Sequence, residues 1–292
     1  MEAYPYRKID AFTSGQSLGN PAACIYLESK ILTDGEMLLI AKQHKGFVSE
    51  VVFCRQTAPA SFHLTYYSSE CEVPFCGHGT IACMYSLLQG DPELQATSEI
   101  TIHTREKGTL TLYNRIPKQN AVFISAPEPL YLETPVSVEM IAKALQINMP
   151  VISNEYPIDF IDAGNRTLIV PIAEFNAEIN IFPDEMQLKD FTLQNGIDVI
   201  LTFCMDTRDK AHAAHTRVFA AKYGYLEDPA TGSANAAFGA YMLKNDLWGG
   251  GNITLEQGGS DRVFNTVHLC LEEGGILFGG SATTRIKGVY YI

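Results

Sequence analysis

One uncharged stretch decides the fold, and it reads Phe75-Cys76-Gly77-His78-Gly79-Thr80-Ile81-Ala82-Cys83-Met84-Tyr85-Ser86-Leu87-Leu88. Its apolar residues recur at the spacing of a helical face, and none of the residues 80–89 is charged. A helix without a polar face is buried on all sides, so a sheet or barrel must surround it. Its first amides have no partner within the helix, and they form a small anion site with His78 at the entrance.

The second half of the chain contains a stretch of the same kind, Asp228-Pro229-Ala230-Thr231-Gly232-Ser233-Ala234-Asn235-Ala236-Ala237-Phe238-Gly239-Ala240-Tyr241-Met242-Leu243. Small residues and a glycine again precede an uncharged helix. Two buried helices predict two lobes. We expect the two helix starts to face each other across a cleft, where two sets of free amides would hold a small anion.

Landmarks of the first half return in the same order in the second half, which indicates a duplicated lobe. The matched glycines are Gly19 with Gly164, Gly46 with Gly196, and Gly77 with Gly232, at offsets of 145, 150 and 155 residues. Strands are expected at 47–53, 98–104, 108–113, 121–125 and 197–203. Three prolines at positions 127, 129 and 135 mark the expected hinge. The predicted lobes are therefore residues 1–126 and 127–292, and the last strand is free to return to the first lobe.

Composition restricts the class of protein. The chain has 292 residues, is 46% hydrophobic and carries a net charge of -12 without a lysine or arginine cluster. This argues against nucleic acid or membrane as a partner, but not against a small anion held by helix amides. The N-terminus does not resemble a signal sequence and no apolar run is long enough to span a bilayer, so we expect a cytoplasmic protein. We expect the seven cysteines to be reduced and to pack as small buried hydrophobic residues; they are Cys24, Cys54, Cys71, Cys76, Cys83, Cys204 and Cys270.

The repeat is informative where its two halves differ. When Gly46 is laid on Gly196, Glu50 falls on Ile200, so one lobe has a carboxylate where the other has an aliphatic residue. On spacing alone, Glu50 is an exposed glutamate on the solvent face of a strand. The alternative is a carboxylate in an apolar cleft, whose proton affinity is raised as a general acid/base requires.

His78 and Asp228 are further candidates. A histidine between two glycines at an anion-binding turn is well placed to contact a ligand. Asp228 is either the capping residue of the second helix or a second carboxylate of the site. Together with Glu50 and the two helix starts, they have the parts needed to move a proton on and off carbon.

Four motifs belong together, Asn20-Pro21-Ala22-Ala23, Ser49-Glu50, Cys76-Gly77-His78-x-Thr80 and Glu227-Asp228-Pro229-Ala230-Thr231-Gly232-Ser233-Ala234. In combination they resemble the PhzF-like (phenazine biosynthesis) family, whose fold is that of diaminopimelate epimerase. The resemblance runs from about Ile9 to the C-terminus. It implies an α+β fold of two pseudo-symmetric lobes, each a mixed or antiparallel, barrel-like β-sheet wrapped around a central buried helix.

The resemblance also implies a function. The residue matching Glu50 would shuttle a proton between carbons of a small carboxylic acid, assisted by those matching His78 and Asp228, without metal or organic cofactor. Members are commonly homodimers. Substrate contacts are assigned to Asn20, Gly77, Gly79, Gly232 and Ser233. Two residues near the site depart from the family pattern, Val51 and Gly79, and they leave the identity of the substrate open.

Two alternatives remain. Cys76-Gly77-His78-Gly79 also resembles the first motif of the proline racemases, which use one cysteine from each lobe. A helix start favours the thiolate of Cys76, but the repeat places Thr231 at the position of the second cysteine, which leaves a single-thiol racemase, epimerase or dehydratase. The non-enzyme alternative is a protein that binds a small carboxylate without changing it. The negative charge of Glu50 beside an anionic ligand argues against this alternative.

Overall fold

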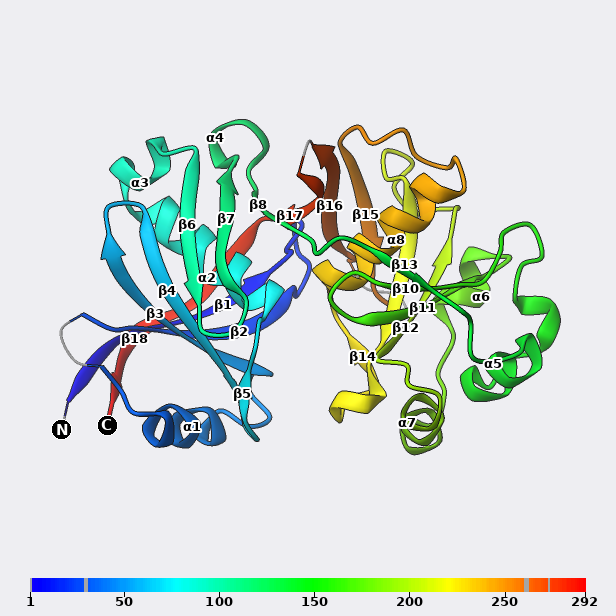
Figure 1. Cartoon of the computed structure of the whole chain (residues 1–292), viewed down its shortest axis with the longest axis horizontal. Coiled ribbons are helices and arrows are strands. Elements are labelled where there is room, and N and C mark those ends of the chain that lie inside the picture. Colours follow the sequence, from blue (N-terminus) through cyan, green and yellow to red (C-terminus); the bar gives the residue numbers. More distant parts are fainter. Residues whose placement is uncertain (1, 29–30, 260–262, 273) are drawn as a thin grey trace. The chain divides into compact units, whose positions relative to one another are not determined.

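A computed structural model describes residues 2–28, 31–259, 263–272 and 274–292. The chain is an α+β protein and divides into two compact units (Figure 1). The first unit comprises 1–13, 18–125 and 279–292, and the second comprises 14–17 and 126–278. Strand β17 (Gly275–Gly280) carries the chain from the second unit back into the first.

The first unit has one long buried helix and a mixed sheet. Its elements are β1 (Ala3–Ala11), β2 (Asn20–Tyr26), α1 (Asp34–Gln43), β3 (Glu50–Ala58), β4 (Ser61–Ser68), β5 (Glu72–Val73), α2 (Gly77–Gly90), α3 (Pro92–Ala96), β6 (Glu99–Thr104), β7 (Gly108–Asn114), α4 (Ile116–Gln119), β8 (Val122–Ser125) and β18 (Ala282–Tyr291). Helix α1 begins with a capping box, because Glu36 N donates to Thr33 Oγ1 and Thr33 N donates to the Glu36 carboxylate.

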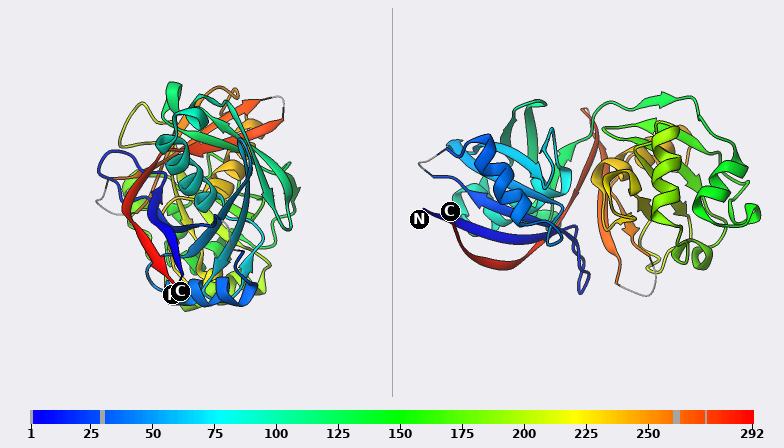
Figure 2. Two further views of the ribbon diagram at one scale, coloured as in Figure 1. Left: turned by 90° about the vertical axis from the view of Figure 1, so that its left-hand side faces the viewer. Right: turned by 90° about the horizontal axis from the view of Figure 1, so that it is seen from below.

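Helix α2 is the centre of the first unit, as its uncharged sequence predicts. Its residues 79–86 are all buried, and it packs against β1, β2, β3, β8 and β18. The ribbon views show strands on several sides of this helix (Figures 1 and 2). Because strands on several sides and α3 cover residues 79–86, a polar face there would have no solvent to contact.

The second unit is built in the same way around α8 (Gly232–Lys244), of which ten residues are buried. Its other elements are β9 (Leu130–Leu132), α5 (Val138–Leu145), η1 (Met149–Val151), β10 (Asp159–Asp162), β11 (Arg166–Pro171), α6 (Phe175–Ile179), α7 (Glu185–Gln194), β12 (Val199–Cys204), β13 (Ala214–Phe219), η2 (Ala221–Tyr223), β14 (Glu227–Asp228), β15 (Ile253–Gln257) and β16 (Asn265–Glu272). Helix α8 packs against β10, β11, β12 and β16.

Strand pairing confirms the internal duplication. In the first unit β2 pairs parallel with β3, β3 antiparallel with β4, and β4 antiparallel with β5 but parallel with β6. The corresponding strands β11, β12, β13, β14 and β15 of the second unit pair in the same directions. Each unit also packs a helix on the outer face of these strands, α1 in the first and α7 in the second.

The pairing register corrects one alignment made from the sequence. Val51 pairs with Tyr67, and Ile200 pairs with the matching Phe219, so the counterpart of Glu50 is Val199 and not Ile200. The physical reason is the connection before the strand, which has three residues after Gly46 but only two after Gly196. Both strands consequently begin later than predicted, and Glu50 is the first residue of β3 rather than its middle.

A one-residue change of register decides which face of a strand a side chain occupies. Val51 and Phe53 lie in the core against α1, whereas Val52 contacts the start of α2. Because side chains alternate along a strand, Glu50 belongs to the face of Val52 and points towards α2. The carboxylate therefore lies on the side of the sheet that carries the buried helix.

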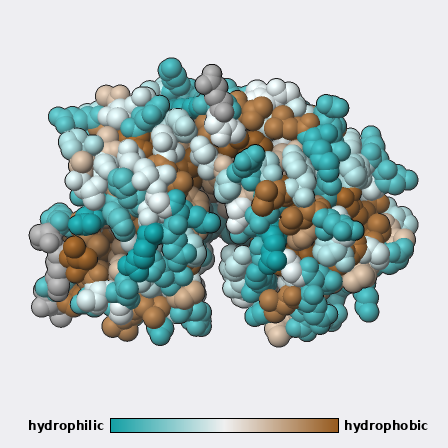
Figure 3. All heavy atoms as spheres, in the orientation of Figure 1, coloured by the Kyte–Doolittle hydropathy of each residue, from teal (hydrophilic) through white to brown (hydrophobic). Residues whose placement is uncertain are grey.

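On the face in Figure 3, hydrophobic side chains occur as separate small groups among hydrophilic ones. Six of the seven cysteines are buried as predicted, but Cys71 is exposed, because it lies in the turn between β4 and β5. Among the described residues, none of the helices has the length and apolar character that a membrane crossing requires.

Candidate functional site

Cys76 is the N-cap residue of α2 and helps to fix the first turn of this helix. Its backbone is extended (φ -127°, ψ 107°), and its Sγ accepts a hydrogen bond from Gly79 N at 3.3 Å. Thr80 Oγ1 donates to the carbonyl oxygen of Cys76 at 2.8 Å and contacts Tyr66 Oη at 2.7 Å. These contacts fix the turn, so the amides of the first helical residues keep their direction.

Gly79 is required by close packing. A Cβ atom at this position would lie 2.8 Å from Val52 Cγ2 and 2.9 Å from Cys76 Sγ. Both distances are shorter than ordinary van der Waals contact, so β3 can approach the helix start only because Gly79 has no side chain. This approach brings Glu50 to the same helix start.

Glu50 and His78 meet at this point. Glu50 Oε2 lies 3.3 Å from His78 Nε2, and the two side chains are only 16% and 12% exposed. Oε2 is buried and has no hydrogen bond of good geometry to a described residue. Burial raises the pKa of the Glu50 carboxyl, and a hydrogen bond from Ser49 partly offsets this rise. The carboxylate thus has one buried oxygen that receives no well-aligned hydrogen bond, and it has an increased affinity for a proton.

Cys76 belongs to the same cluster. Its Sγ lies 3.5 Å from His78 Nδ1 and 3.8 Å from His78 Nε2. One donor atom from each of Glu50, Cys76 and His78 lies within 4.8 Å of the others. The structure therefore brings three residues chosen from the sequence together in one unit, including the alternative catalytic residue.

Asn20 lies at the beginning of the neighbouring strand. It is the first residue of β2, is 1% exposed, and precedes by two positions Ala22, the residue that pairs with Glu50. Gly19 before it has φ +71°, and a Cβ there would lie 2.7 Å from the carbonyl oxygen of Ala11. The turn therefore needs glycine to place Asn20.

In the second unit, Asp228 does not cap α8. It belongs to the short strand β14 and is 8% exposed, whereas the N-cap residue is Thr231. Thr231 has almost the same backbone conformation (φ -127°, ψ 103°) as Cys76 in the first unit. The strand β14 forms because Asp228 pairs with Val218, which removes this residue from the helix start. Thr231 Oγ1 donates to the Asp228 carboxylate.

Gln257 holds this loop, and sequence reasoning missed it. Its side chain is fully buried and accepts from Thr231 N at 2.9 Å, and it donates to the carbonyl oxygen of Asp228 at 2.8 Å and to Thr231 Oγ1 at 3.2 Å. Gln257 also accepts from Asn235 Nδ2 at 2.6 Å. No local sequence motif marks Gln257, because it reaches the loop from β15.

Gly232 and Ser233 begin α8. A Cβ at Gly232 would lie 2.2 Å from the ring of Phe278, so this position is closed to any side chain. Ser233 Oγ accepts a hydrogen bond from Asn165 Nδ2 at 2.8 Å. Asn165 was not among the predicted site residues, although the repeat that matches Gly19 with Gly164 places it on Asn20.

The two candidate carboxylates, Glu50 and Asp228, lie at positions of the repeated strands that do not correspond to each other. Glu50 corresponds to Val199, and Asp228 corresponds to Val73, since the two residues occupy matching positions in β14 and β5. Each of these two acids therefore occupies a position at which the other unit has a valine. Such a replacement costs free energy unless the carboxylate has a partner or a function.

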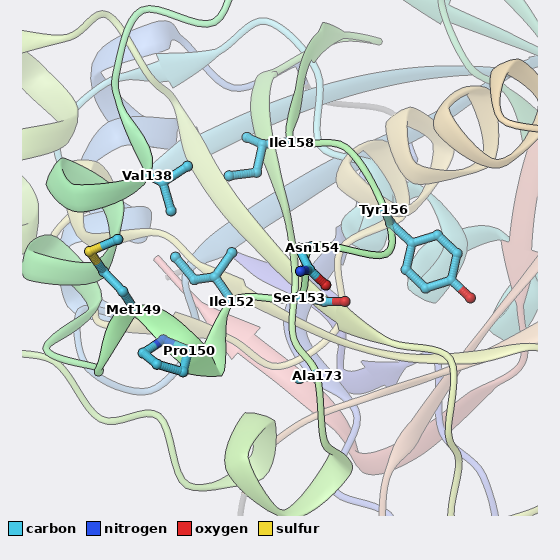
Figure 4. A pocket seen from close by; sticks show the side chains of 9 residues that line it. All are labelled: Val138, Met149, Pro150, Ile152, Ser153, Asn154, Tyr156, Ile158 and Ala173. Atoms are coloured by element: carbon cyan, nitrogen blue, oxygen red, sulfur yellow. The ribbon is translucent and has the colours of Figure 1, made fainter.

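The second unit has a separate surface pocket (Figure 4), with a volume of about 650 Å³. Its lining is mainly apolar, and none of the predicted site residues contributes to it; the lining residues are Val138, Met149, Pro150, Ile152, Ser153, Asn154, Tyr156, Ile158 and Ala173. The pocket has no charged side chain that could orient a carboxylate.

Comparison with known proteins identifies the family. The model of the PhzC-PhzF family, described as phenazine biosynthesis-like protein, matches residues 9–275. The chain belongs to this family. "Uncharacterized isomerase YfhB" of Bacillus subtilis is 28% identical over 272 residues, which is 92% of this chain and 90% of that protein.

Solved structures agree with this assignment. The phenazine biosynthesis protein of the PhzF family from Bacillus anthracis has a TM-score of 0.85 and 25% identity, with 100% of both chains covered. A probable proline racemase from Agrobacterium radiobacter has a TM-score of 0.63 and 11% identity, with 99% of this chain and 92% of that one covered, which shows a shared fold. This PhzC-PhzF family member is thus an enzyme of the isomerase type.

Proposed function

We propose that this family member is a cofactor-independent isomerase in which Glu50 moves a proton between carbons of a small carboxylic acid. The observation that supports this most directly is the unsatisfied Oε2 of Glu50, 3.3 Å from His78 Nε2 at the start of a buried helix. A buried carboxylate oxygen that receives no hydrogen bond destabilises the charged form of the group. It is therefore suited to take a proton from a substrate that approaches the helix start.

The other residues have assigned roles in this proposal. The substrate carboxylate binds to backbone amides at the helix start, which it can approach closely because Gly77 and Gly79 have no side chains. His78 stabilises the charge that develops on the substrate or relays the proton. Asp228, Gly232 and Ser233 of the second unit, together with Asn20, are assigned to the same reaction on the strength of the family motifs that they match.

Proton exchange tests this proposal. A panel of small cyclic and amino-substituted carboxylic acids is incubated with the protein in deuterated water and followed by proton NMR. The native protein is expected to exchange or isomerise one compound, and Glu50→Gln to lose this activity about 100-fold or more. Glu106→Gln, in an exposed turn, is the matched control and should keep it. Exchange that persists in Glu50→Gln would contradict the mechanism.

A single-thiol mechanism is the second candidate, because Cys76 Sγ lies 3.5 Å from His78 Nδ1. The equivalent N-cap position in the second unit is Thr231, which excludes a matched pair of cysteines at the two helix starts. Exchange that is lost in Cys76→Ser but kept in Glu50→Gln would favour this candidate. If no compound exchanges and a carboxylate still protects the protein against heat, a binding protein is the remaining interpretation.

A further inference from the structure

The donor atoms at the start of α2 match a metal coordination set. Glu50 offers oxygen, Cys76 sulfur and His78 nitrogen, the three donor types that bind Zn²⁺ in proteins. The three side chains are largely buried, and the sulfur accepts an N–H from Gly79, a supporting hydrogen bond that orients a ligand. Among the described residues, this is the one group of three such side chains close enough to hold an ion.

Two of the three donor-to-donor distances are near those between ligands of tetrahedral zinc. With Zn–S of about 2.3 Å and Zn–N and Zn–O of about 2.0–2.2 Å, tetrahedral angles place sulfur about 3.5 Å from nitrogen and nitrogen about 3.4 Å from oxygen. In the structure Cys76 Sγ lies 3.8 Å from His78 Nε2, and this nitrogen lies 3.3 Å from Glu50 Oε2. The three donor atoms lie within 4.8 Å of one another, but Cys76 Sγ is nearer to His78 Nδ1 (3.5 Å) than to Nε2, so the Cys76 side chain has to rotate towards Nε2 to complete this geometry.

We infer that Glu50, Cys76 and His78 bind a divalent transition-metal ion, with Zn²⁺ preferred, and that the bound ion inhibits the isomerase. Binding releases the thiol proton of Cys76 to the solvent, and the thiolate, the imidazole and the carboxylate then share the ion. The fourth position remains for water. The inhibition rests on the proposed function, because a metal on Glu50 occupies the oxygen that would accept the substrate proton.

Metal binding can be measured without any substrate. Titration of the reduced native protein with Co²⁺ is expected to give a thiolate-to-cobalt charge-transfer band, and calorimetry with Zn²⁺ a stoichiometry of one at micromolar or tighter affinity. Cys76→Ser should lose the band and weaken Zn²⁺ binding at least tenfold, and His78→Gln should weaken it similarly. Cys71→Ser removes an exposed cysteine elsewhere and serves as the control that keeps both signals.

The outcomes separate this inference from the proposed function. Absence of stoichiometric binding, or unchanged binding in both Cys76→Ser and His78→Gln, would overturn the metal site whatever the protein catalyses. A circular dichroism spectrum of each variant shows whether it is folded. Because Cys76→Ser and His78→Gln remove different ligands, the test still stands if one of them misfolds. Once a substrate is found, Zn²⁺ should abolish exchange and a chelator should restore it. Exchange that persists in protein saturated with Zn²⁺ would refute the inhibition.

Discussion

At the scale of single residues, the side chains of Thr231 and Gln257 hold the Asp228 loop in place. Thr231 Oγ1 donates to the Asp228 carboxylate, and Gln257 donates to both the Thr231 hydroxyl and the Asp228 backbone. Because the hydroxyl receives one proton from Gln257, its own proton is directed towards Asp228. Thr231 is therefore expected to act as a positioning residue for Asp228.

Removal of this hydroxyl tests the positioning role. Thr231→Val keeps the shape of the side chain but loses a hydrogen bond to a charged group, which is worth about 1.5–3 kcal/mol. We expect the rate of substrate exchange to fall roughly 10–100-fold, with a smaller change in KM, as measured by NMR. Thr231→Ser retains the hydroxyl and should restore most of the rate. Equal rates in the native protein and Thr231→Val would show that Asp228 needs no such support.

A second test at this scale concerns Gly79, where any side chain meets Val52 and Cys76 below 3.0 Å. Gly79→Ala is expected to destabilise the protein by about 1–3 kcal/mol through overpacking, as measured by urea unfolding. Gly35→Ala is the matched control, because Gly35 lies in α1 with open space around it and alanine favours helix there. A Gly79→Ala protein as stable as the native one would show that β3 can move away from α2.

At the scale of elements, Asp198 joins the strands and a helical turn of the second unit. It precedes β12 and accepts hydrogen bonds from the backbone and guanidinium of Arg166 at the start of β11, and from Lys222 in η2. Burial raises the pKa of Asp198, but the bonds from Arg166 and Lys222 outweigh burial, so the pKa lies below the ordinary aspartate value. A lowered carboxyl pKa stabilises the fold above the ordinary pKa and ceases to do so as the pH falls through the lowered one.

Asp198→Asn should therefore destabilise the protein at neutral pH by roughly 1 kcal/mol, a value kept small because Arg166 is 43% exposed to solvent. The difference from the native protein should shrink in acid, where the native carboxylate is also protonated. Chemical unfolding at several pH values measures this. Asp190→Asn, exposed on α7, controls for the loss of a charge. A difference that is independent of pH would contradict the electrostatic explanation.

At the scale of the whole molecule, the two ends of the chain complete the first unit. Strand β18 pairs along the whole of β1, and Glu2 and Ile292 exchange backbone hydrogen bonds, so the termini lie side by side (Figure 2). The first unit therefore depends on β18, which follows the whole of the second unit in the sequence. Folding of this unit must wait for the C-terminal strand, a contact of very large sequence separation.

Deletion of residues 282–292 tests this dependence. The net stability of a domain is about 5–15 kcal/mol, and loss of an entire paired strand exposes β1 and part of α2. We expect the truncated protein to lose cooperative unfolding of the first unit in circular dichroism and calorimetry. Removal of Ile292 alone keeps nearly all of the strand and serves as the control. A truncated protein with the native transition would show that β18 is dispensable.

The sequence predicted the elements best where the signal is local. Uncharged helices after glycine turns identified α2 and α8. Residues that act across long separations were missed. Gln257 reaches the Asp228 loop from another strand, and the fully buried pair of Glu178 and His215 joins α6 to β13. Neither has a spacing that reveals its partner.

The sequence by itself determined the duplicated plan, the two buried helices and the residue types of the candidate site, because periodicity, glycine turns and repeated motifs are local properties of the chain. Only the tertiary structure decided the strand register. It assigned Glu50 to the face of α2 and made Val199 its counterpart, through a difference of one residue in a connecting loop. It also moved Asp228 from the helix cap into β14. Register and pairing depend on contacts between distant segments, which no local pattern specifies.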